Sequence, residues 1–190
     1  MGKLIVSENV SLDGVIEDPR GEGDLGRGDW FALISDTDRA AWAETLHAEA
    51  VAAEALLLGR RSYEYFAARY PFRSGGWAQR LNSMPKYVVS ATLHSPDAWA
   101  NSTILKGEVV DEVTALKNTV RGEIVVYASG GLVPTLVEHD LVDELRLMTY
   151  PLVVGAGRRL FGETSGLKPL RRVDTRTVGE GLALLTYQPA

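Results

Sequence analysis

Two short turns in the sequence carry the residue types that bind phosphate groups. The first is Gly59–Ser62, which reads GRRS and directly follows the apolar run Leu56–Leu58. The second is Ser129–Gly131, which reads SGG and follows the apolar segment IVVY. Glycine lets the backbone approach a ligand closely, and free N–H groups at a strand-to-helix junction favour an anion. Arg60 and Arg61 add guanidinium groups that match phosphate geometry. Two such turns in one domain favour a dinucleotide over a single phosphate.

Other residues could take part in chemistry, and each has an ordinary structural alternative. Trp30 follows a long glycine-rich loop, so it could form the aromatic wall of a substrate pocket, which we favour, or anchor the core. Asp13 and Gly14 form either a plain turn or a place where a flat ring meets the backbone. Asp36 and Asp38 begin a predicted helix, where carboxylates complement the helix dipole or could serve as a catalytic acid.

Several common site types are not expected. A literal G-x-G-x-x-G occurs over residues 21–26, but Glu22 and Asp24 would repel a pyrophosphate, and no strand-helix junction lies there. The chain has no cysteine, so thiolate catalysis and cysteine-based metal sites are excluded. Its three histidines share no metal-ligand spacing; they are His47, His94 and His139. We therefore expect no metal.

The composition is that of one ordinary globular domain. The chain has 190 residues, of which 45% are hydrophobic and 24% charged, so residues 1–190 are expected to share one core. The formal net charge of −5 makes nucleic acid an improbable partner. The N-terminal residues lack a signal-peptide pattern, and no apolar run approaches a membrane span of about 20 residues. A cytoplasmic location with no membrane partner is expected by default.

These candidate residues must be positioned by alternating strands and helices. Helices are expected over Ser35–Ala53 and over residues 60–70, 111–118 and 132–140. Strands are expected over Lys3–Ser7 with a continuation over Val10–Glu17, and over residues 54–59, 85–93, 102–107, 122–131, 143–155, 169–178 and 182–189. This order predicts an α/β fold with a mainly parallel central sheet, helices on both faces and an antiparallel C-terminal hairpin.

The same segments resemble a known family. KLIVSENVSLDGVIE, ALLLGRRSYEYF, MPKYVVSATL, VVYASGGLVPTLVEHDLVDELRLMTYPLVVGAGRRLF and LALLTYQP look like the dihydrofolate-reductase-like superfamily. The closer resemblance is to the C-terminal reductase domain of bifunctional riboflavin-biosynthesis deaminase/reductases, and it runs from Lys3 to Pro189. It implies a three-layer sandwich and an NADPH-dependent reductase that transfers hydride to a small heterocyclic or imine-type substrate. It also implies a homodimer.

The resemblance assigns roles to individual positions. It implies that the 2′-phosphate and pyrophosphate of NADPH bind at Gly59, Arg60, Arg61 and Ser62, with Ser90 near the adenosine. A second pyrophosphate turn would comprise Gly130, Gly131 and Leu132. Asp13 and Gly14 would lie near the nicotinamide, and Trp30 would lie where cofactor and substrate meet.

The sequence also departs from the family. Folate reductases carry a buried carboxylate on the first helix, for which Asp36 and Asp38 are the loose matches here. Riboflavin-pathway reductases carry an acidic residue where this chain has Ala128, so that substrate position differs. Neither the folate nor the riboflavin-pathway substrate can be carried over. A non-catalytic NADP(H)-binding module or redox sensor stays an alternative, and so does a flavin-binding protein.

Overall fold

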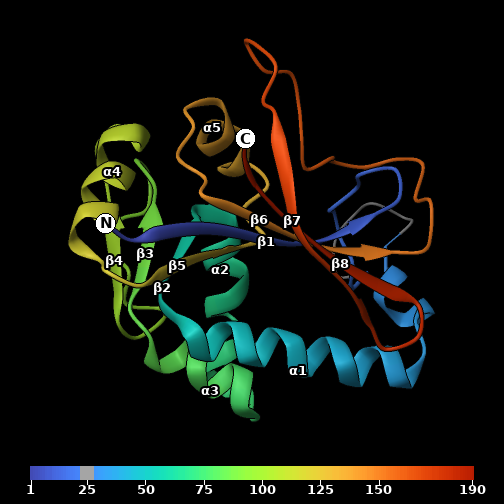
Figure 1. Ribbon diagram of the computed structural model, residues 1–190. Helices are drawn as coiled ribbons and strands as arrows, with labels where there is room; N and C mark the ends of the chain where they lie inside the picture. Colours follow the sequence, from blue (N-terminus) through green and yellow to red (C-terminus); the bar gives the residue numbers. More distant parts are fainter. Residues whose placement is uncertain (22–27) are drawn as a thin grey trace.

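The fold is built on one sheet that runs through the middle of the molecule. A computed structural model describes residues 1–21 and 28–190, and the rejected glycine motif over residues 21–26 falls almost entirely outside them. Within the described residues, eight strands pair in the order β4-β3-β2-β5-β1-β6-β8-β7 (Figure 1). Their bounds are β1 Lys3–Ser11, β2 Ala53–Gly59, β3 Lys86–Val89, β4 Ser102–Leu105, β5 Glu123–Tyr127, β6 Glu144–Tyr150, β7 Leu170–Val178 and β8 Leu182–Pro189.

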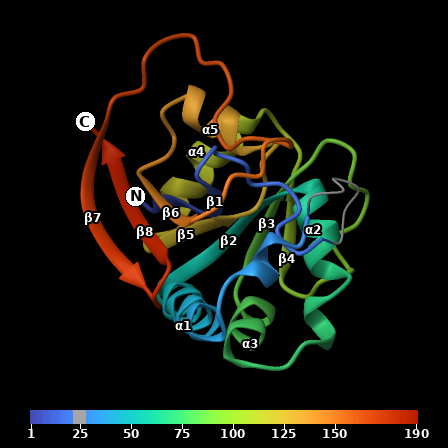
Figure 2. The ribbon, with the colours of Figure 1, turned by 90° about the vertical axis from the view of Figure 1, so that its right-hand side faces the viewer.

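Helices cover both faces of this sheet and make it the middle of three layers (Figure 2). One face is covered by α1 (Asp36–Ala52), α2 (Arg60–Ala67) and α3 (Gly76–Ser83). The other is covered by α4 (Val109–Thr119) and α5 (Val133–Glu138). Single 3-10 turns occur at Trp30–Leu33 and Tyr70–Phe72. The predicted α/β sandwich is confirmed.

Strand direction also follows the prediction. Neighbouring pairs among β4, β3, β2, β5, β1 and β6 are parallel, whereas β8 is antiparallel to both β6 and β7. Parallel strands are buried on both faces, so successive side chains must all be apolar. This explains short apolar runs such as Leu56–Leu58. The terminal hairpin is the expected antiparallel addition.

Helix α1 shows why the local sequence folds as it does. The Ser35 hydroxyl accepts the backbone N–H of Asp38 at 3.0 Å, so the expected N-cap is present. Trp42, Leu46 and Ala50 fall on one side of the helix at helical spacing and are buried against the sheet. The predicted helix therefore forms, and it ends at Ala52, one residue before its expected end, because Ala53 adopts an extended backbone and begins β2.

One local prediction was wrong, and one helix was missed. The expected strand over Val10–Glu17 stops at Ser11, because the chain turns at Gly14, whose φ of 82° is left-handed. Beyond that turn only a single bridge joins Val15 to Arg159. Helix α3 was not predicted, since its eight residues carry only two buried apolar side chains and begin with glycine.

The order of the strands creates a crevice between β1 and β5. The chain leaves β1 toward α1 on one face and leaves β5 toward α5 on the other, so the connections diverge at this pair. Ligands of open α/β sheets bind at such a divergence, outside the carboxyl ends of the strands. The last residue pair between the strands is Ser7 with Tyr127, and β1 continues beside β6 to Ser11. Glu8 and Asn9 therefore lie beyond the end of β5.

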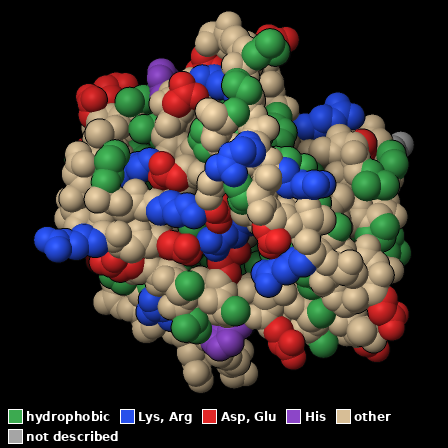
Figure 3. Space-filling view, in the orientation of Figure 1, with side chains coloured by type: hydrophobic (Ala, Val, Ile, Leu, Met, Phe, Trp, Pro, Cys, Tyr) green, Lys and Arg blue, Asp and Glu red, His purple; other side chains and the backbone are tan. Residues whose placement is uncertain are grey.

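The surface seen in Figure 3 carries basic and acidic side chains intermixed over the sheet, without a field of one sign. No helix among the residues described is long and apolar enough to cross a membrane.

Candidate functional site

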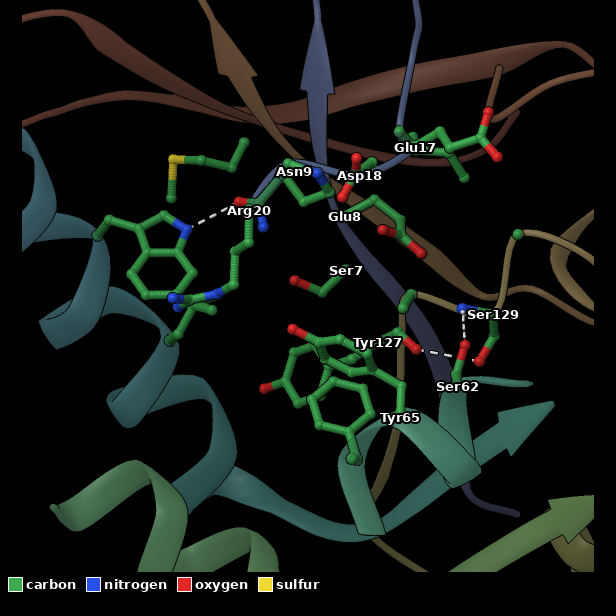
Figure 4. Close-up of a pocket in the computed structure, with 18 of the residues that line it drawn as sticks. Ser7, Glu8, Asn9, Glu17, Asp18, Arg20, Ser62, Tyr65, Tyr127 and Ser129 are labelled. Atoms are coloured by element: carbon green, nitrogen blue, oxygen red, sulfur yellow. Dashed lines mark hydrogen bonds between the residues drawn. The ribbon is translucent and has the colours of Figure 1, made fainter. Parts of the chain in front are cut away.

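The two predicted phosphate turns lie side by side and are joined by hydrogen bonds. The Gly59 N–H donates to the Ser129 hydroxyl at 3.1 Å, and the Ser129 N–H donates to the Ser62 hydroxyl at 2.8 Å. These residues are about 70 positions apart, but β2 and β5 are parallel neighbours, so their carboxyl ends meet. Figure 4 shows Ser62 and Ser129 in this contact. The turns therefore form one rigid unit.

The second turn has an unusual backbone. Ala128 and Ser129 are consecutive non-glycine residues with left-handed φ angles of 51° and 63°. Each such residue costs about 1–3 kcal/mol, and strain of this kind collects at functional sites. Gly130 follows because a Cβ there would lie 2.6 Å from the Ile16 side chain. The loop after β1 is thus packed directly onto this turn.

The first turn leaves room that the protein itself does not use. Gly59 has a φ of −78°, which any residue adopts, and a Cβ there would meet only Leu132 at an ordinary 3.6 Å. Neither the backbone nor the packing of the described residues requires glycine at this position. Helix α2 begins immediately after it without a side-chain cap. Open space beside uncapped helix N–H groups fits a phosphate of a bound cofactor.

The two arginines of this turn are held differently. Arg60 pairs with Glu64 at 2.7 Å and donates to the Thr92 hydroxyl at 2.6 Å. Arg61 is exposed and lines the cavity described below. Ser90 lies at the end of β3 and accepts the backbone N–H groups of Thr92 and Leu93, so its hydroxyl shapes the next turn. Arg61 is thus the arginine placed to meet a ligand.

A cavity of about 470 Å³ opens beside the joined turns, over the carboxyl ends of β1 and β5 (Figure 4). Arg61, Ser62, Ala128 and Gly130 line it, so the structure brings these four predicted residues together. One side is a wall of aromatic rings, formed by Trp42, Tyr65, Phe66, Tyr70, Trp77 and Tyr127. A cavity of this size with an aromatic wall and polar side chains that converge on it is typical of a small-molecule site.

Four buried polar atoms that make no hydrogen bond of good geometry to a described residue face this one cavity. They are Glu8 Oε1, Glu49 Oε1, Trp77 Nε1 and the Tyr127 hydroxyl. A buried polar group that lacks a partner costs roughly 1–3 kcal/mol. Their concentration in a single cavity makes it the candidate site for a ligand with complementary polar groups.

Glu49 is a buried carboxylate near the end of helix α1, and it lines the cavity. One of its oxygens accepts the Ser7 hydroxyl at 3.2 Å and lies 3.7 Å from the Arg146 guanidinium. Burial raises the pKa of Glu49, while the charge of Arg146 opposes that rise. Arg146 also pairs with Glu123 and Glu144. Beside Glu49, burial and then the nearby carboxylate raise the pKa of Tyr127 well above 10.

Glu8 is a second buried carboxyl in the cavity. It is 7% exposed, and no hydrogen bond or ion pair reaches it from the residues the structure describes. Burial alone raises the pKa of Glu8 well above its usual value. The cavity therefore combines one carboxylate with a cationic partner and one carboxyl without.

The aspartates predicted as catalytic do not line this cavity. Asp36 is almost fully exposed and pairs with Arg39 at 2.7 Å. Asp38 Oδ1 accepts the backbone N–H groups of Glu180 and Gly181, at 2.6 and 2.9 Å, and so fastens the β7–β8 hairpin to α1. These hydrogen bonds lower the pKa of Asp38. The structure moves the candidate carboxylate from the first turn of α1 to Glu49 near its end.

Asp13 and Gly14 also lie outside the cavity lining. The Asp13 carboxylate accepts the Ser11 hydroxyl and the N–H groups of Val154 and Gly155, at 2.7, 3.0 and 2.9 Å. These bonds, the Ser11 bond foremost, lower the pKa of Asp13 to about 2. Asp13 thus ties the loop after β1 to the loop after β6. That Asp13 and Gly14 lie near a bound nicotinamide stays a prediction.

Trp30 packs as a core residue. It is 2% exposed, does not line the cavity, and contacts the Tyr150 ring edge-on at 4.7 Å. Its indole N–H donates to the Glu17 carbonyl at 3.1 Å. Of the two interpretations of Trp30, the structure favours the core anchor, which holds the loop segment that carries Glu17. Leu132 is likewise buried, and its N–H donates to the Ser129 carbonyl.

The sequence did carry signals for the missed acids. Glu8 is the only charged residue after Lys3 in the strand KLIVSENVS, whose other residues are apolar or small and polar. Glu49 lies three residues after Leu46 and next to Ala50, on the buried side of α1. A charged residue on an apolar face is unusual because its burial requires a partner or a shifted pKa.

Among the described residues, no group of three or more potential ligands could hold a metal ion.

A model of the RibD C-terminal domain matches residues 2–184. The chain belongs to the RibD C-terminal domain family. Two curated relatives from Bacillus subtilis (strain 168) are the uncharacterized proteins YyaP and YwjB. YyaP is 27% identical, with 97% of this chain and 94% of YyaP covered, and YwjB is 24% identical, with 96% and 95% covered.

Solved structures show the same fold. A protein from Shewanella sp. PV-4, named for riboflavin biosynthesis, superposes with a TM-score of 0.74 at 22% identity over 99% of both chains. A dihydrofolate reductase from Enterococcus faecalis, solved with NADP(H), superposes with a TM-score of 0.63 at 16% identity. The match covers 98% of this chain and 96% of the reductase. A bifunctional deaminase/5-amino-6-(5-phosphoribosylamino)uracil reductase from Thermotoga maritima gives 0.65 at 13% identity, over all of this chain and 57% of that one.

Proposed function

We propose that this protein is an NADPH-dependent reductase that transfers hydride to a small heterocyclic or imine-type substrate. The observation that carries the proposal is the joined pair of turns, which opens onto a cavity lined by buried polar atoms without partners. Membership in a family with reductase-like folds supports it, and so does a structural neighbour solved with NADP(H). A bound reduced nicotinamide would supply the hydride.

The residues of the joined turns would hold the cofactor. Arg61 would meet a phosphate as a charge-assisted donor, because its guanidinium lies at the cavity without an ion pair to another described side chain. The open space over Gly59 would admit the phosphate close to the backbone. Arg60 would act less directly, since Glu64 and Thr92 already hold it.

The far side of the cavity would hold the substrate. The aromatic wall suits a flat ring, which would stack or contact these side chains edge-on. Glu49, Tyr127 and Trp77 would supply the polar contacts, since each presents an unsatisfied atom there. Closing the cavity around the ring would exclude water and hold the acceptor carbon in place.

Titration of the protein with NADPH and NADH tests the cofactor. We expect NADPH to bind tighter, and Arg61→Ala to weaken NADPH by roughly 10- to 100-fold, because a charge-assisted contact is worth about 1.5–3 kcal/mol. The same variant should bind NADH nearly as before. Arg60→Ala is the matched control and should have the smaller effect. Equal affinity of the wild type for NADPH and NADH would contradict the proposal.

Turnover separates the proposal from its alternatives. NADPH oxidation would be followed with dihydrofolate, a pyrimidine, a quinone and a cyclic imine as acceptors. NADPH binding without oxidation across this panel would favour a non-catalytic module or redox sensor. A purified protein that carries yellow FMN would favour a flavin protein. The expected homodimer stays a prediction, which sedimentation equilibrium would test.

A further inference from the structure

We infer that Glu8 is the acid of this cavity, a neutral carboxylic acid that supplies the proton completing reduction of the substrate. The inference rests on the proposed function and adds a proton source to it. From the sequence, Asp36 and Asp38 at the start of α1 were the candidates for this role. The structure places neither of them in the cavity lining.

The position of Glu8 follows from the stagger of the strands. Strand β5 ends at Tyr127, opposite Ser7, so Glu8 pairs only with Leu147 of β6 and has no neighbour on its β5 side. Successive side chains of a strand point to opposite faces. Ser7 therefore faces α1 and donates to Glu49, whereas Glu8 points the other way, toward the side where Ser129 lies (Figure 4). The two carboxyls reach one cavity from opposite faces of the sheet.

Burial raises the pKa of both carboxyls, but their surroundings stabilise the two anions to different degrees. Glu49 has the Arg146 cation at 3.7 Å and a hydroxyl donor, both of which favour its anion. Glu8 has neither among the described residues, so burial keeps its proton on. Because only Glu49 has a cation and a hydroxyl donor that stabilise its anion, Glu8 is the carboxyl that we assign as the proton donor.

Other charged groups of the cavity lining do not reverse this assignment. The acidic ones are Glu17, Asp18 and Glu49, and the basic ones are Arg20, Arg61 and Arg158. Arg20 lies 4.8 Å over the Phe31 ring. Acidic groups, like the phosphates expected at the joined turns, disfavour a charged Glu8. Tyr127 is a poorer donor, because its raised pKa makes it a weaker acid.

The proton balance is complete with groups already named. Reduction of a C=N bond adds a hydride, with its electron pair, to carbon and a proton to nitrogen. The hydride comes from the reduced nicotinamide of the proposed function, and the proton comes from the Glu8 carboxyl as its O–H bond breaks. Glu8 is left as a carboxylate and regains a proton from water through the open mouth of the cavity. No further oxidant or reductant is required.

The first test needs no substrate. Carboxyl carbons of glutamate-labelled protein would be titrated by NMR, with Glu8→Gln used to assign the Glu8 signal. We expect this signal to titrate at a clearly higher pH than the usual range of a glutamate carboxyl. A Glu8 signal that titrates together with the exposed glutamates would overturn the inference.

The second test compares kinetics with NADPH and the best acceptor of the panel. Glu8→Gln should lower kcat on the order of 100-fold, the usual contribution of a general acid. It should bind NADPH as the wild type does and lose the decline of kcat at high pH, which Glu8→Asp should restore. Glu49→Gln should instead raise KM and keep that decline, and Glu44→Gln should change neither.

The outcomes are distinguishable. A fully active Glu8→Gln overturns the inference and leaves the proposed function standing. Weakened NADPH binding with an unchanged pH profile also overturns it, because Glu8 would then only position the cofactor. A wild type that reduces none of the acceptors overturns the proposed function itself, and the role of Glu8 with it.

Discussion

Helix α1 carries acidic residues at both ends, and the two ends differ in what their carboxylates contact. At the first turn, Asp38 accepts two backbone N–H groups of the β7–β8 hairpin, and its pKa is lowered. Near the last turn, Glu49 keeps one oxygen without a partner in an aromatic cavity, and burial raises its pKa.

This difference separates structural from functional carboxylates better than sequence position does. A carboxylate whose lone pairs are taken up by backbone N–H groups is stabilised as an anion and has little left to offer a ligand. A desolvated carboxyl with a free oxygen is costly to the fold unless something binds it. Helix α1 thus fastens the hairpin with one end and lines the site with the other.

The largest expected change in stability follows removal of Arg146, the cation beside Glu49. Arg146→Met should lower the free energy of unfolding by about 3–5 kcal/mol, because it leaves the buried carboxylate of Glu49 without its cation and removes one of the two cations that pair with Glu144. Urea denaturation measures the change. Arg39→Met, which breaks the exposed pair with Asp36 at the other end, should cost less than about 1 kcal/mol. Equal losses would erase the distinction between the two ends.

A smaller loss of stability is expected when the hydrogen bonds between Asp38 and the β7–β8 hairpin are removed. Asp38→Ala should lower the free energy of unfolding by about 2 kcal/mol, because two backbone N–H groups lose a charged acceptor. NADPH affinity should stay as in the wild type, since Asp38 does not line the cavity. Thermal denaturation and cofactor titration of the same sample check both statements. Impaired turnover in a stably folded Asp38→Ala would return this residue to the candidate active site.

The smallest effect is in the dependence of stability on pH, where the two kinds of carboxyl act with opposite signs. Asp13 and Asp38 have lowered pKa values, so their contribution to stability is present above pH 3.8 and is lost at lower pH, for Asp13 as the pH falls through its pKa of about 2. Glu8 and Glu49 have raised pKa values, so they reduce stability as the pH rises above 4.5. The melting temperature of the ligand-free protein should therefore decline from mildly acidic toward neutral pH.

The Glu8→Gln variant sharpens this comparison. Because the amide has no proton to lose, the variant should melt higher than the wild type at neutral pH and show a flatter profile there. The acid side of the profile should be unchanged, since Asp13 and Asp38 remain. A neutral-pH decline as steep as that of the wild type would show that Glu8 does not titrate above its usual range.

Much of the fold could be predicted from local pattern. The burial of an element can be predicted from its apolar pattern. Examples are the apolar run Leu56–Leu58 and the helical spacing of Trp42, Leu46 and Ala50. The two turns at the carboxyl ends of β2 and β5 could also be located from the sequence, because glycines after a buried strand mark a strand-to-helix junction; phosphate binding there stays a prediction. Helix α3 and the end of β1 were not, since neither has a strong local period.

The sequence by itself determined the layered α/β architecture and the two turns suited to phosphate, because these depend on neighbours a few residues apart. Only the tertiary structure decided which acids face the cavity. Glu49 becomes a candidate because Ser7 and Arg146, about 42 and 97 positions away, meet it across the sheet. Asp38 ceases to be one because the hairpin at Glu180 folds back onto it. Burial and hydrogen-bond partners fix the character of a carboxyl, and both come from residues distant in the chain.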